Sequence, residues 1–384
     1  MNPLFESLPT TIFTRMSALA GEHDAVNLGQ GFPDFGWPDD VVACAAQALL
    51  TGSNQYAPMA GLPDLRRAVA DHYRRHQGLE IDPDQVTVTS GATEALAASI
   101  AALVTPGDEV LLFQPLYDAY LPLVLRAGGV PRTIRLTPPD WRITAQALAE
   151  AFTDRTRLVV FNNPHNPSSR VFDDDELGLL AKACVRHDSI ALSDEVWEHV
   201  VFDGRGHRPL AALPGMGART VKVGSAGKIF ALTGWKVGWV VAPPNLAGPI
   251  AKAHQFLTFS TAPNLQAACA LGLAKPEAWF ETMRRDLCDA RDRLVAGLRG
   301  AGYATLPAQG TYFVGIDLPG SGLEVDDMTF CERAVREAGV AAIPLSTFYA
   351  ERPVTSVVRL CFAKRPATLA AGVERLAAAR KLFG

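Results

Sequence analysis

The sequence predicts an α/β protein with a mostly parallel sheet, joined to a smaller α+β part near the C-terminus. From about residue 85 onward, short β-branched runs alternate with helix-like stretches. Most of these runs are apolar at every position, as expected for strands that helices cover on both faces of a parallel sheet. The chain has 384 residues, a length that fits two domains of unequal size better than one.

Five apolar runs are expected to be strands of this sheet. In chain order they are VTVT at 86–89, VLLF at 110–113, RLVVF at 157–161, SIAL at 189–192 and TVKVG at 220–224. The stretches 92–104 and 173–187 have the pattern of crossover helices.

After about residue 274 the pattern changes. A long amphipathic helix is predicted over 277–298, then a strand in GTYFVGID at 310–317, a helix over 326–339, a strand in VVRLCF at 357–362 and a final helix. We therefore expect a large domain over 36–274 and a small domain over 275–384.

The composition gives no sign of a macromolecular or membrane partner. Charged residues make up 20% of the chain and the net charge is -4, so neither nucleic acid nor an anionic membrane is an expected partner. The six cysteines form no CxxC pair, which excludes a zinc ribbon or a disulfide scaffold and favours a reducing, cytoplasmic compartment. No leader pattern or stretch of about 18 apolar residues is present, so we expect a soluble, unprocessed protein.

Several common catalytic motifs are absent. The chain has no GxxxxGK[ST], GxSxG or HExxH, and no GxGxxG follows a first strand. Its eight histidines show no metal-binding spacing, so we expect no metal, and His199 and His207 are expected to be surface or loop residues.

Polar residues follow the predicted strands at the edge where open α/β sheets bind ligands. They are SGAT at 90–93, NNPHNP at 162–167, SDE at 193–195 and SAGK at 225–228, with TGWK at 233–236. Each alone has an ordinary explanation as a turn or a helix cap. Asp194, however, ends a buried strand, where a carboxylate is costly without a cationic partner.

Together these groups match the requirements of pyridoxal 5′-phosphate (PLP) chemistry. PLP needs a lysine amine for a Schiff base, a carboxylate at its pyridine nitrogen, and small hydroxyl and amide groups around its phosphate. Lys228 and Asp194 suit the first two roles.

The chain resembles the class I and II aminotransferases of PLP fold type I over nearly its whole length. The resemblance rests on NLGQGFPDF at 27–35, NQYAPMAG at 54–61, NNPHNP at 162–167, SDEV at 193–196, GSAGKIFALTGWKVGW at 224–239 and VVRLCF at 357–362. Two of these motifs are most similar to the branch of kynurenine (glutamine) transaminases and methionine aminotransferases. It implies a seven-stranded sheet, a homodimer, and an arm over 1–35 that joins the small domain.

The resemblance also implies a role for each matching position. Lys228 would be the Schiff-base lysine and proton shuttle, Asp194 the partner of the pyridine nitrogen, and Arg359 the ligand of the substrate α-carboxylate. The other implied cofactor contacts are Gly91, Ala92, Thr93, Tyr117, Asn162, Asn166, Ser225, Lys236 and, from a neighbouring subunit, Tyr56. Implied substrate contacts are Gly31, Asn166, Phe13 and Phe259. The alternatives without a functional role are a structural ion pair for Arg359 and a core position for Tyr117.

One position departs from the family pattern. Where relatives have a tyrosine three residues beyond the aspartate, this chain has Trp197. An indole can donate a hydrogen bond to the cofactor's phenolic oxygen but cannot ionise, and Trp197 could also turn away.

The expected activity is transfer of an amino group from a neutral or aromatic amino acid, of the methionine, phenylalanine, glutamine or kynurenine type, to a 2-oxo acid. Two alternatives share the same scaffold: a cysteine-conjugate β-lyase and an N-succinyldiaminopimelate-type aminotransferase. A non-catalytic regulatory module ranks last, because the lysine is present and too few residues precede NLGQGFPDF for a helix-turn-helix domain.

Overall fold

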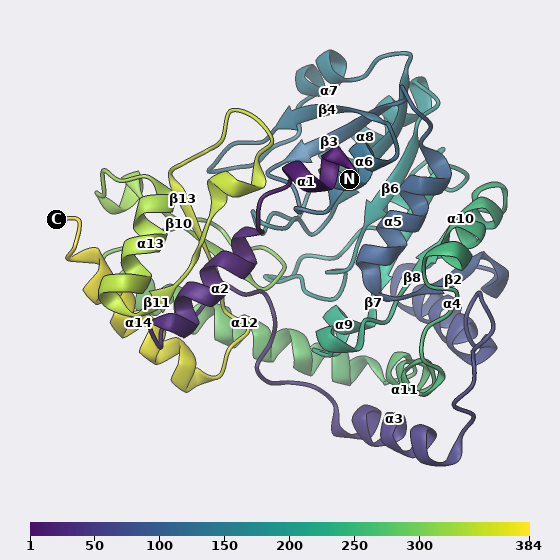
Figure 1. Ribbon diagram of the computed structural model, residues 1–384, viewed down its shortest axis with the longest axis horizontal. Helices are drawn as coiled ribbons and strands as arrows, with labels where there is room; N and C mark the ends of the chain where they lie inside the picture. Colours follow the sequence, from purple (N-terminus) through teal and green to yellow (C-terminus); the bar gives the residue numbers. More distant parts are fainter.

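A seven-stranded sheet forms the centre of the larger part of the molecule (Figure 1). The computed structural model describes residues 1–384. The strand order is β2-β8-β7-β6-β5-β3-β4, and β8 alone runs antiparallel to its neighbours. The strands are β2 Val86–Thr89, β3 Glu109–Gln114, β4 Val130–Arg135, β5 Thr156–Asn162, β6 Ile190–Asp194, β7 Thr220–Ser225 and β8 Gly238–Val241.

Both faces of this sheet are buried, which explains the continuous apolar runs. Alternate side chains of β3 belong to different cores, because successive residues of a strand point to opposite faces. Val110 and Leu112 join a cluster of 59 buried residues, whereas Leu111 and Phe113 join a separate cluster of 24. Truncating one of these side chains to alanine would cost about 2–5 kcal/mol of stability.

Helices cover the sheet on both sides. On one face α5 (Gly91–Leu103) packs against β7 and β8, with α6 (Tyr120–Arg126) beside β3 and α10 (Pro244–Leu257) outside α5. The opposite face is covered by α4 Pro63–Gln77, α7 Ala145–Ala151, α8 Asp174–Arg186 and α11 Pro263–Leu273, with α3 Asp39–Thr51 packed on α11.

A second, antiparallel sheet lies in the C-terminal part, in the order β12-β13-β10-β9. The N-terminal segment joins this C-terminal part: β1 pairs in parallel with β11 in a separate two-stranded sheet, and the purple α2 lies among the yellow-green C-terminal elements (Figure 1). The strands are β1 Val26–Asn27, β9 Ala304–Thr305, β10 Phe313–Asp317, β11 Val340–Ala341, β12 Ile343–Pro344 and β13 Val357–Cys361. The remaining helices are α1 Pro3–Ser7, α2 Ile12–Glu22, α9 Ala226–Ile229, α12 Glu277–Gly300, α13 Asp327–Ala338 and α14 Pro366–Arg380.

The predicted fold class is confirmed, and all five apolar runs are strands of the central sheet. Two strands of that sheet had no such signal. The edge strand β4 is partly exposed and reads VPRTIR, with a proline and two arginines, so it has no apolar run. The other is β8, whose four residues directly follow the polar TGWK turn.

None of the helices has the length and apolar character needed to cross a membrane. The six cysteines are all free thiols.

Candidate active site

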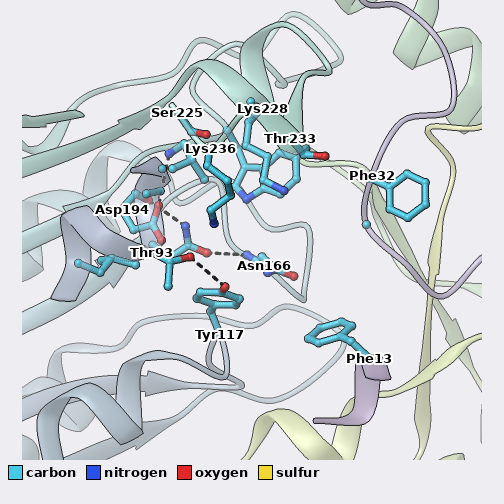
Figure 2. Close-up of a pocket in the computed structure, with 18 of the residues that line it drawn as sticks. Phe13, Phe32, Thr93, Tyr117, Asn166, Asp194, Ser225, Lys228, Thr233 and Lys236 are labelled. Carbon is cyan, nitrogen blue, oxygen red and sulfur yellow. Dashed lines mark hydrogen bonds between the residues drawn. The ribbon is translucent and has the colours of Figure 1, made fainter. Parts of the chain in front are cut away.

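A cavity of about 320 Å³ opens at the carboxyl edge of the central sheet. Asn162, Asp194 and Ser225 are the last residues of the parallel strands β5, β6 and β7, so their side chains reach the same edge. The strand β2 runs in the same direction, which brings the start of α5 to this edge as well. Figure 2 shows Asp194, Ser225, Lys228 and Lys236 gathered on one side of the cavity, with Phe13 and Phe32 across from them.

Lys228 lies on the short helix α9, directly after β7, and its amine faces the cavity. Its Nζ lies 4.7 Å from the ring centroid of Trp197, and its backbone carbonyl accepts a 2.5 Å hydrogen bond from the hydroxyl of Tyr312. The pKa of Lys228 is lowered to about 8, mainly by burial and in smaller part by the charges of Arg359 and Lys236, while Cys361 and Asp194 act in the opposite direction. At pH 7 about a tenth of the amine is therefore neutral and nucleophilic, far more than for a lysine with the usual pKa of about 10.4.

Trp197 does not turn away from the site. Its ring forms part of the cavity wall beneath the Lys228 amine and is 3% exposed. Tyr312 and Phe313 pack edge-on against the indole and fix its orientation. The aromatic face, rather than a phenol, is thus the group that Lys228 contacts.

Asp194 is a buried carboxylate that forms no ion pair with the protein. The hydroxyl of Tyr120 donates a 2.6 Å hydrogen bond to its Oδ2, and the backbone N–H of Val196 donates a weaker one of 3.4 Å. Burial raises the pKa of Asp194, and these two hydrogen bonds, with the charge of Lys228, oppose the rise. The carboxylate can still accept a cationic group from the cavity.

The two asparagines connect the ends of the site. The side chain of Asn162 donates a 2.8 Å hydrogen bond to the backbone carbonyl of Asp194 and accepts one of 2.7 Å from the backbone of Asn166. Asn166 in turn accepts a 2.8 Å hydrogen bond from Nη1 of Arg359. The predicted NNPHNP turn therefore links β6 to β13, which lie far apart in the sequence.

Arg359 is 1% exposed and forms no ion pair. One nitrogen binds Asn166, another donates 3.2 Å to the carbonyl of Gly29, and Nε has no partner. The guanidinium lies 3.9 Å from the ring centroid of Phe313, and burial lowers its pKa to about 9. Such a group is poised for a carboxylate ligand, and the predicted alternative of a structural ion pair is wrong.

The start of α5 forms a cradle for an anion. No side chain caps this helix, so its first backbone N–H groups and its dipole face the cavity. Gly91 has a φ of +76°, and a Cβ there would lie 3.2 Å from Cε of Lys236. The backbone of Gly238 approaches just as closely, because a Cβ at that position would lie 2.8 Å from the nitrogen of Ala92.

Two side chains extend this cradle toward the middle of the cavity. The hydroxyls of Thr93 and Tyr117 lie 3.4 Å apart (Figure 2). Burial raises the pKa of Tyr117, so its phenol stays neutral. Tyr117 thus lies in the cavity wall rather than in the core alone.

All predicted site residues except Tyr56 and Phe259 line this one cavity. Those two lie on the surface, 84% and 40% exposed, with their rings packed edge-on 5.4 Å apart. Within a single chain, neither residue is in a position to make its predicted contact in the cavity. The cavity also contains residues to which the sequence assigned no individual role: Gln30, Phe32, Leu96, Tyr120, Val196, Gly227, Thr233, Val237 and Phe313.

His199 and His207 were predicted to be surface or loop residues; both lie in loops, but neither side chain is on the surface. His199 is 5% exposed, and the side chain of His207 is equally covered while it hydrogen-bonds Glu195 over 2.7 Å. Both lie behind the strand that carries Asp194, and neither lines the cavity.

Comparison with known proteins finds similarity over nearly the whole chain. The family profile for aminotransferase class I and II matches residues 23–376. Methionine aminotransferase of Escherichia coli is 45% identical over 96% of each chain. Kynurenine–oxoglutarate transaminase 1 of Homo sapiens is 38% identical over 93% of each. The solved structure of N-succinyldiaminopimelate aminotransferase from Mycobacterium tuberculosis superposes with a TM-score of 0.94, at 43% identity, over 98% of this chain and 99% of that one.

Proposed function

Since this chain belongs to the class I and II aminotransferases, we propose that the cavity is its PLP and substrate site. The chain is a PLP-dependent transferase that moves an amino group from an amino acid to a 2-oxo acid. One observation carries the assignment of the site. A buried carboxylate and a buried guanidinium, neither paired within the protein, face the same cavity as a lysine amine of lowered pKa.

The residues present fit PLP. The uncapped start of α5, the Ser225 hydroxyl and the Lys236 amine would hold its phosphate, and Tyr117 would stack on its ring. Asp194 would keep a proton on the ring nitrogen. Asn166 and the indole N–H of Trp197 are the donors available to its phenolic oxygen. When bound, PLP supplies an electron sink for the negative charge that develops at the substrate Cα.

Arg359 would hold the α-carboxylate of the substrate. Nε and the Nη nitrogens form a planar fork that suits a bidentate contact, and Asn166 already fixes one arm of it. Gly31 lines the cavity with its backbone against Phe313, and a side chain does not fit there because a Cβ would lie 2.5 Å from that ring. The amino acid is thus oriented with its Cα toward Lys228.

Lys228 would move the proton. With a pKa of about 8, its neutral Nζ can take the proton from the substrate Cα and then donate it to another atom within the same cavity. The hydrogen bond from Tyr312 fixes the backbone of Lys228, and the ring of Trp197 limits where its side chain can move. Burial of the site excludes water that would compete for the proton.

The lining favours a neutral or aromatic donor. The cations of the cavity are Lys228, Lys236 and Arg359, each with a role above, so none remains for a second substrate carboxylate. Phe13, Phe32 and Phe313 offer apolar surface beside Arg359. A relative from Mycobacterium tuberculosis, 42% identical, is described as a probable N-succinyldiaminopimelate aminotransferase, which makes that activity the second candidate.

The functional unit would be a homodimer. Tyr56 is exposed beside Phe259 and would complete the phosphate contacts of a second copy, while Phe259 would reach that copy's substrate pocket. Within one chain we assign 36–274 to the large domain, 275–384 to the small domain and 1–35 to an arm that joins it. The six free thiols suit the cytoplasm.

Rates with a panel of donors test the substrate proposal. Methionine, phenylalanine, glutamine and kynurenine should each exceed aspartate in kcat/KM by at least about tenfold, the value of one missing charge-assisted contact. Preference for aspartate or N-succinyldiaminopimelate would contradict it. Mixing Tyr56→Ala and Lys228→Ala chains, each inactive alone, should restore activity if the sites are shared between subunits. No recovery in mixed dimers would refute that sharing.

A further inference from the structure

A cluster of imidazoles lies behind the active site, outside its cavity. His72 and His76 are one turn apart on α4, and His199 follows β6 five residues after Asp194. The ring centroid of His76 lies 4.4 Å from that of His72 and 5.0 Å from that of His199. Three of the eight histidines therefore meet at one point, although their sequence spacing showed no metal pattern.

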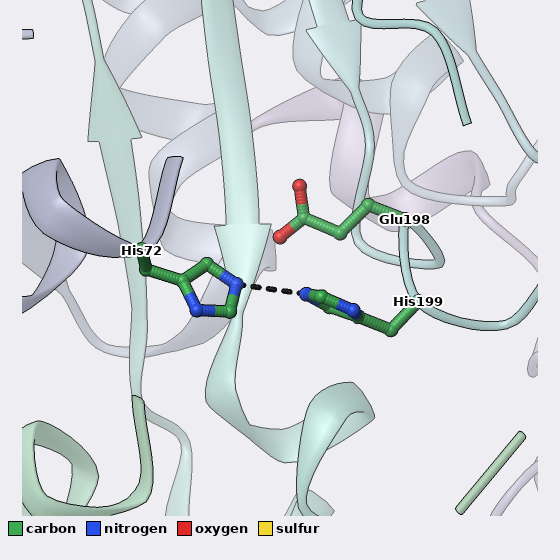
Figure 3. Close-up of side chains that lie close together, drawn as sticks. All are labelled: His72, Glu198 and His199. Carbon is green, nitrogen blue, oxygen red and sulfur yellow. Dashed lines mark hydrogen bonds between the residues drawn. The ribbon is translucent and has the colours of Figure 1, made fainter. Parts of the chain in front are cut away.

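The inner ligand atoms already converge. Nε2 of His72 lies 2.7 Å from Nε2 of His199, and a carboxylate oxygen of Glu198 lies within 4.8 Å of both (Figure 3). These three residues are at most 5% exposed. Tetrahedral zinc with Zn–N bonds of about 2.0–2.1 Å needs about 3.3 Å between two ligand nitrogens. The two rings would have to separate by only about half an ångström.

Glu198 supplies the second, independent observation. Its Oε2 accepts hydrogen bonds from Lys222 and from Gln77, over 2.8 Å and 2.6 Å, but its buried Oε1 has no partner. Glu195 beside it is fully occupied by Lys222, His207 and Ser193. Glu198 therefore offers a buried carboxylate oxygen that no group of the protein satisfies.

The cluster is accessible. A second cavity, of about 570 Å³, reaches Glu198, His199 and His76 and shares no lining residue with the active-site cavity. Four arginines also line this second cavity, of which Arg284 pairs with Glu277 and Arg75 donates to a backbone carbonyl.

We propose that His72, His199 and Glu198 form a site for one zinc-like divalent cation, with water from the second cavity as the fourth ligand. Two imidazoles, a carboxylate and water are a donor set that Zn²⁺ accepts. The ion ties α4 to the segment that begins at Asp194 and includes Trp197. Its role is structural, because no ligand lines the active-site cavity.

Zinc binding by the PLP-loaded protein tests the site. After treatment with EDTA and desalting, calorimetric titration with ZnCl₂ should show one ion per chain with a Kd of about 1 µM or below. His72→Gln and His199→Gln should each weaken binding at least 100-fold, with the PLP absorbance unchanged as evidence of folding. The matched control His187→Gln, at a half-buried histidine outside the cluster, should bind as the wild type does.

Two results would overturn the site. One is no binding by the wild type up to about 100 µM zinc; the other is binding that survives both substitutions, which would place the ion on the surface. If the variants do not fold, anomalous diffraction at the zinc edge from wild-type crystals decides. A peak among the three side chains supports the proposal, and a peak elsewhere or none rejects it.

Discussion

Replacing Arg359 by methionine separates its proposed role in substrate binding from a structural one. The guanidinium is 1% exposed, unpaired by any carboxylate, and its pKa falls from 12.5 to about 9 because of burial. At about 1.4 kcal/mol for each factor of ten, the protein disfavours the charged form by about 5 kcal/mol relative to water. A structural ion pair would have no such imbalance.

Two opposing effects then set the stability of Arg359→Met. The substitution relieves the buried charge but leaves the oxygens of Asn166 and Gly29 without a donor, at about 1 kcal/mol each. We expect the free energy of unfolding without substrate to change by less than about 2 kcal/mol. In contrast, loss of two charge-assisted hydrogen bonds to the substrate, about 1.5–3 kcal/mol each, should lower kcat/KM by about 10²–10⁴-fold.

Steady-state kinetics and chemical denaturation measure the two effects on the same protein preparations. Arg359→Lys keeps the charge without the fork and should lose less, about 10–100-fold. A simple monocarboxylate should raise the Tm of the wild type and leave that of Arg359→Met unchanged. The reasoning fails if Arg359→Met keeps kcat/KM within tenfold, or if it loses more than about 4 kcal/mol of stability.

Four further predictions concern the rest of the cavity. Burial lowers the pKa of Lys228 to about 8. The rate at which the apoenzyme captures PLP should therefore rise about tenfold per pH unit up to pH 8 and then level off. A rate profile with its midpoint near pH 10 would contradict this. The folded state binds fewer protons than the unfolded state between pH 8 and 10.5, so apoenzyme stability should rise with pH across that window, and Lys228→Met should lack the rise. Tyr120→Phe removes the 2.6 Å hydrogen bond to Asp194 and should lower kcat about tenfold, far less than Asp194→Asn; equal losses would mean that the charge of Asp194 is not what matters. Trp197→Phe should shift the pH titration of the cofactor absorbance, and an unchanged curve would count against an indole contact.

Local sequence was informative about the fold where the sheet is covered on both sides. The runs that form β5, β6 and β7 are apolar because helices bury both their faces, so the pattern itself reports the environment. The edge strand β4 lacks that environment and therefore lacks the pattern. The pairing of β1 with β11 joins residues more than 300 positions apart, and nothing in VN at 26–27 marks it as a strand.

The site was predictable to the extent that its residues follow strand ends. Motif resemblance then assigned roles to Lys228, Asp194 and Arg359 that spacing alone could not. The hydrogen bond from Tyr120 to Asp194, and the ring of Phe313 under Arg359, arise only when distant segments pack together. His199 was misplaced for the same reason, since its burial depends on α4, more than 100 residues earlier.

The central claim is that this cavity holds PLP on Lys228 and carries out half of a transamination when an amino acid alone is added. The purified protein should absorb near 400–430 nm, a rough expectation for protein-bound PLP. Adding methionine or another preferred donor without a 2-oxo acid should replace this band with that of pyridoxamine phosphate, and a 2-oxo acid should restore it. Absence of the band, even after PLP is added, or a band that no amino acid changes, would contradict the account.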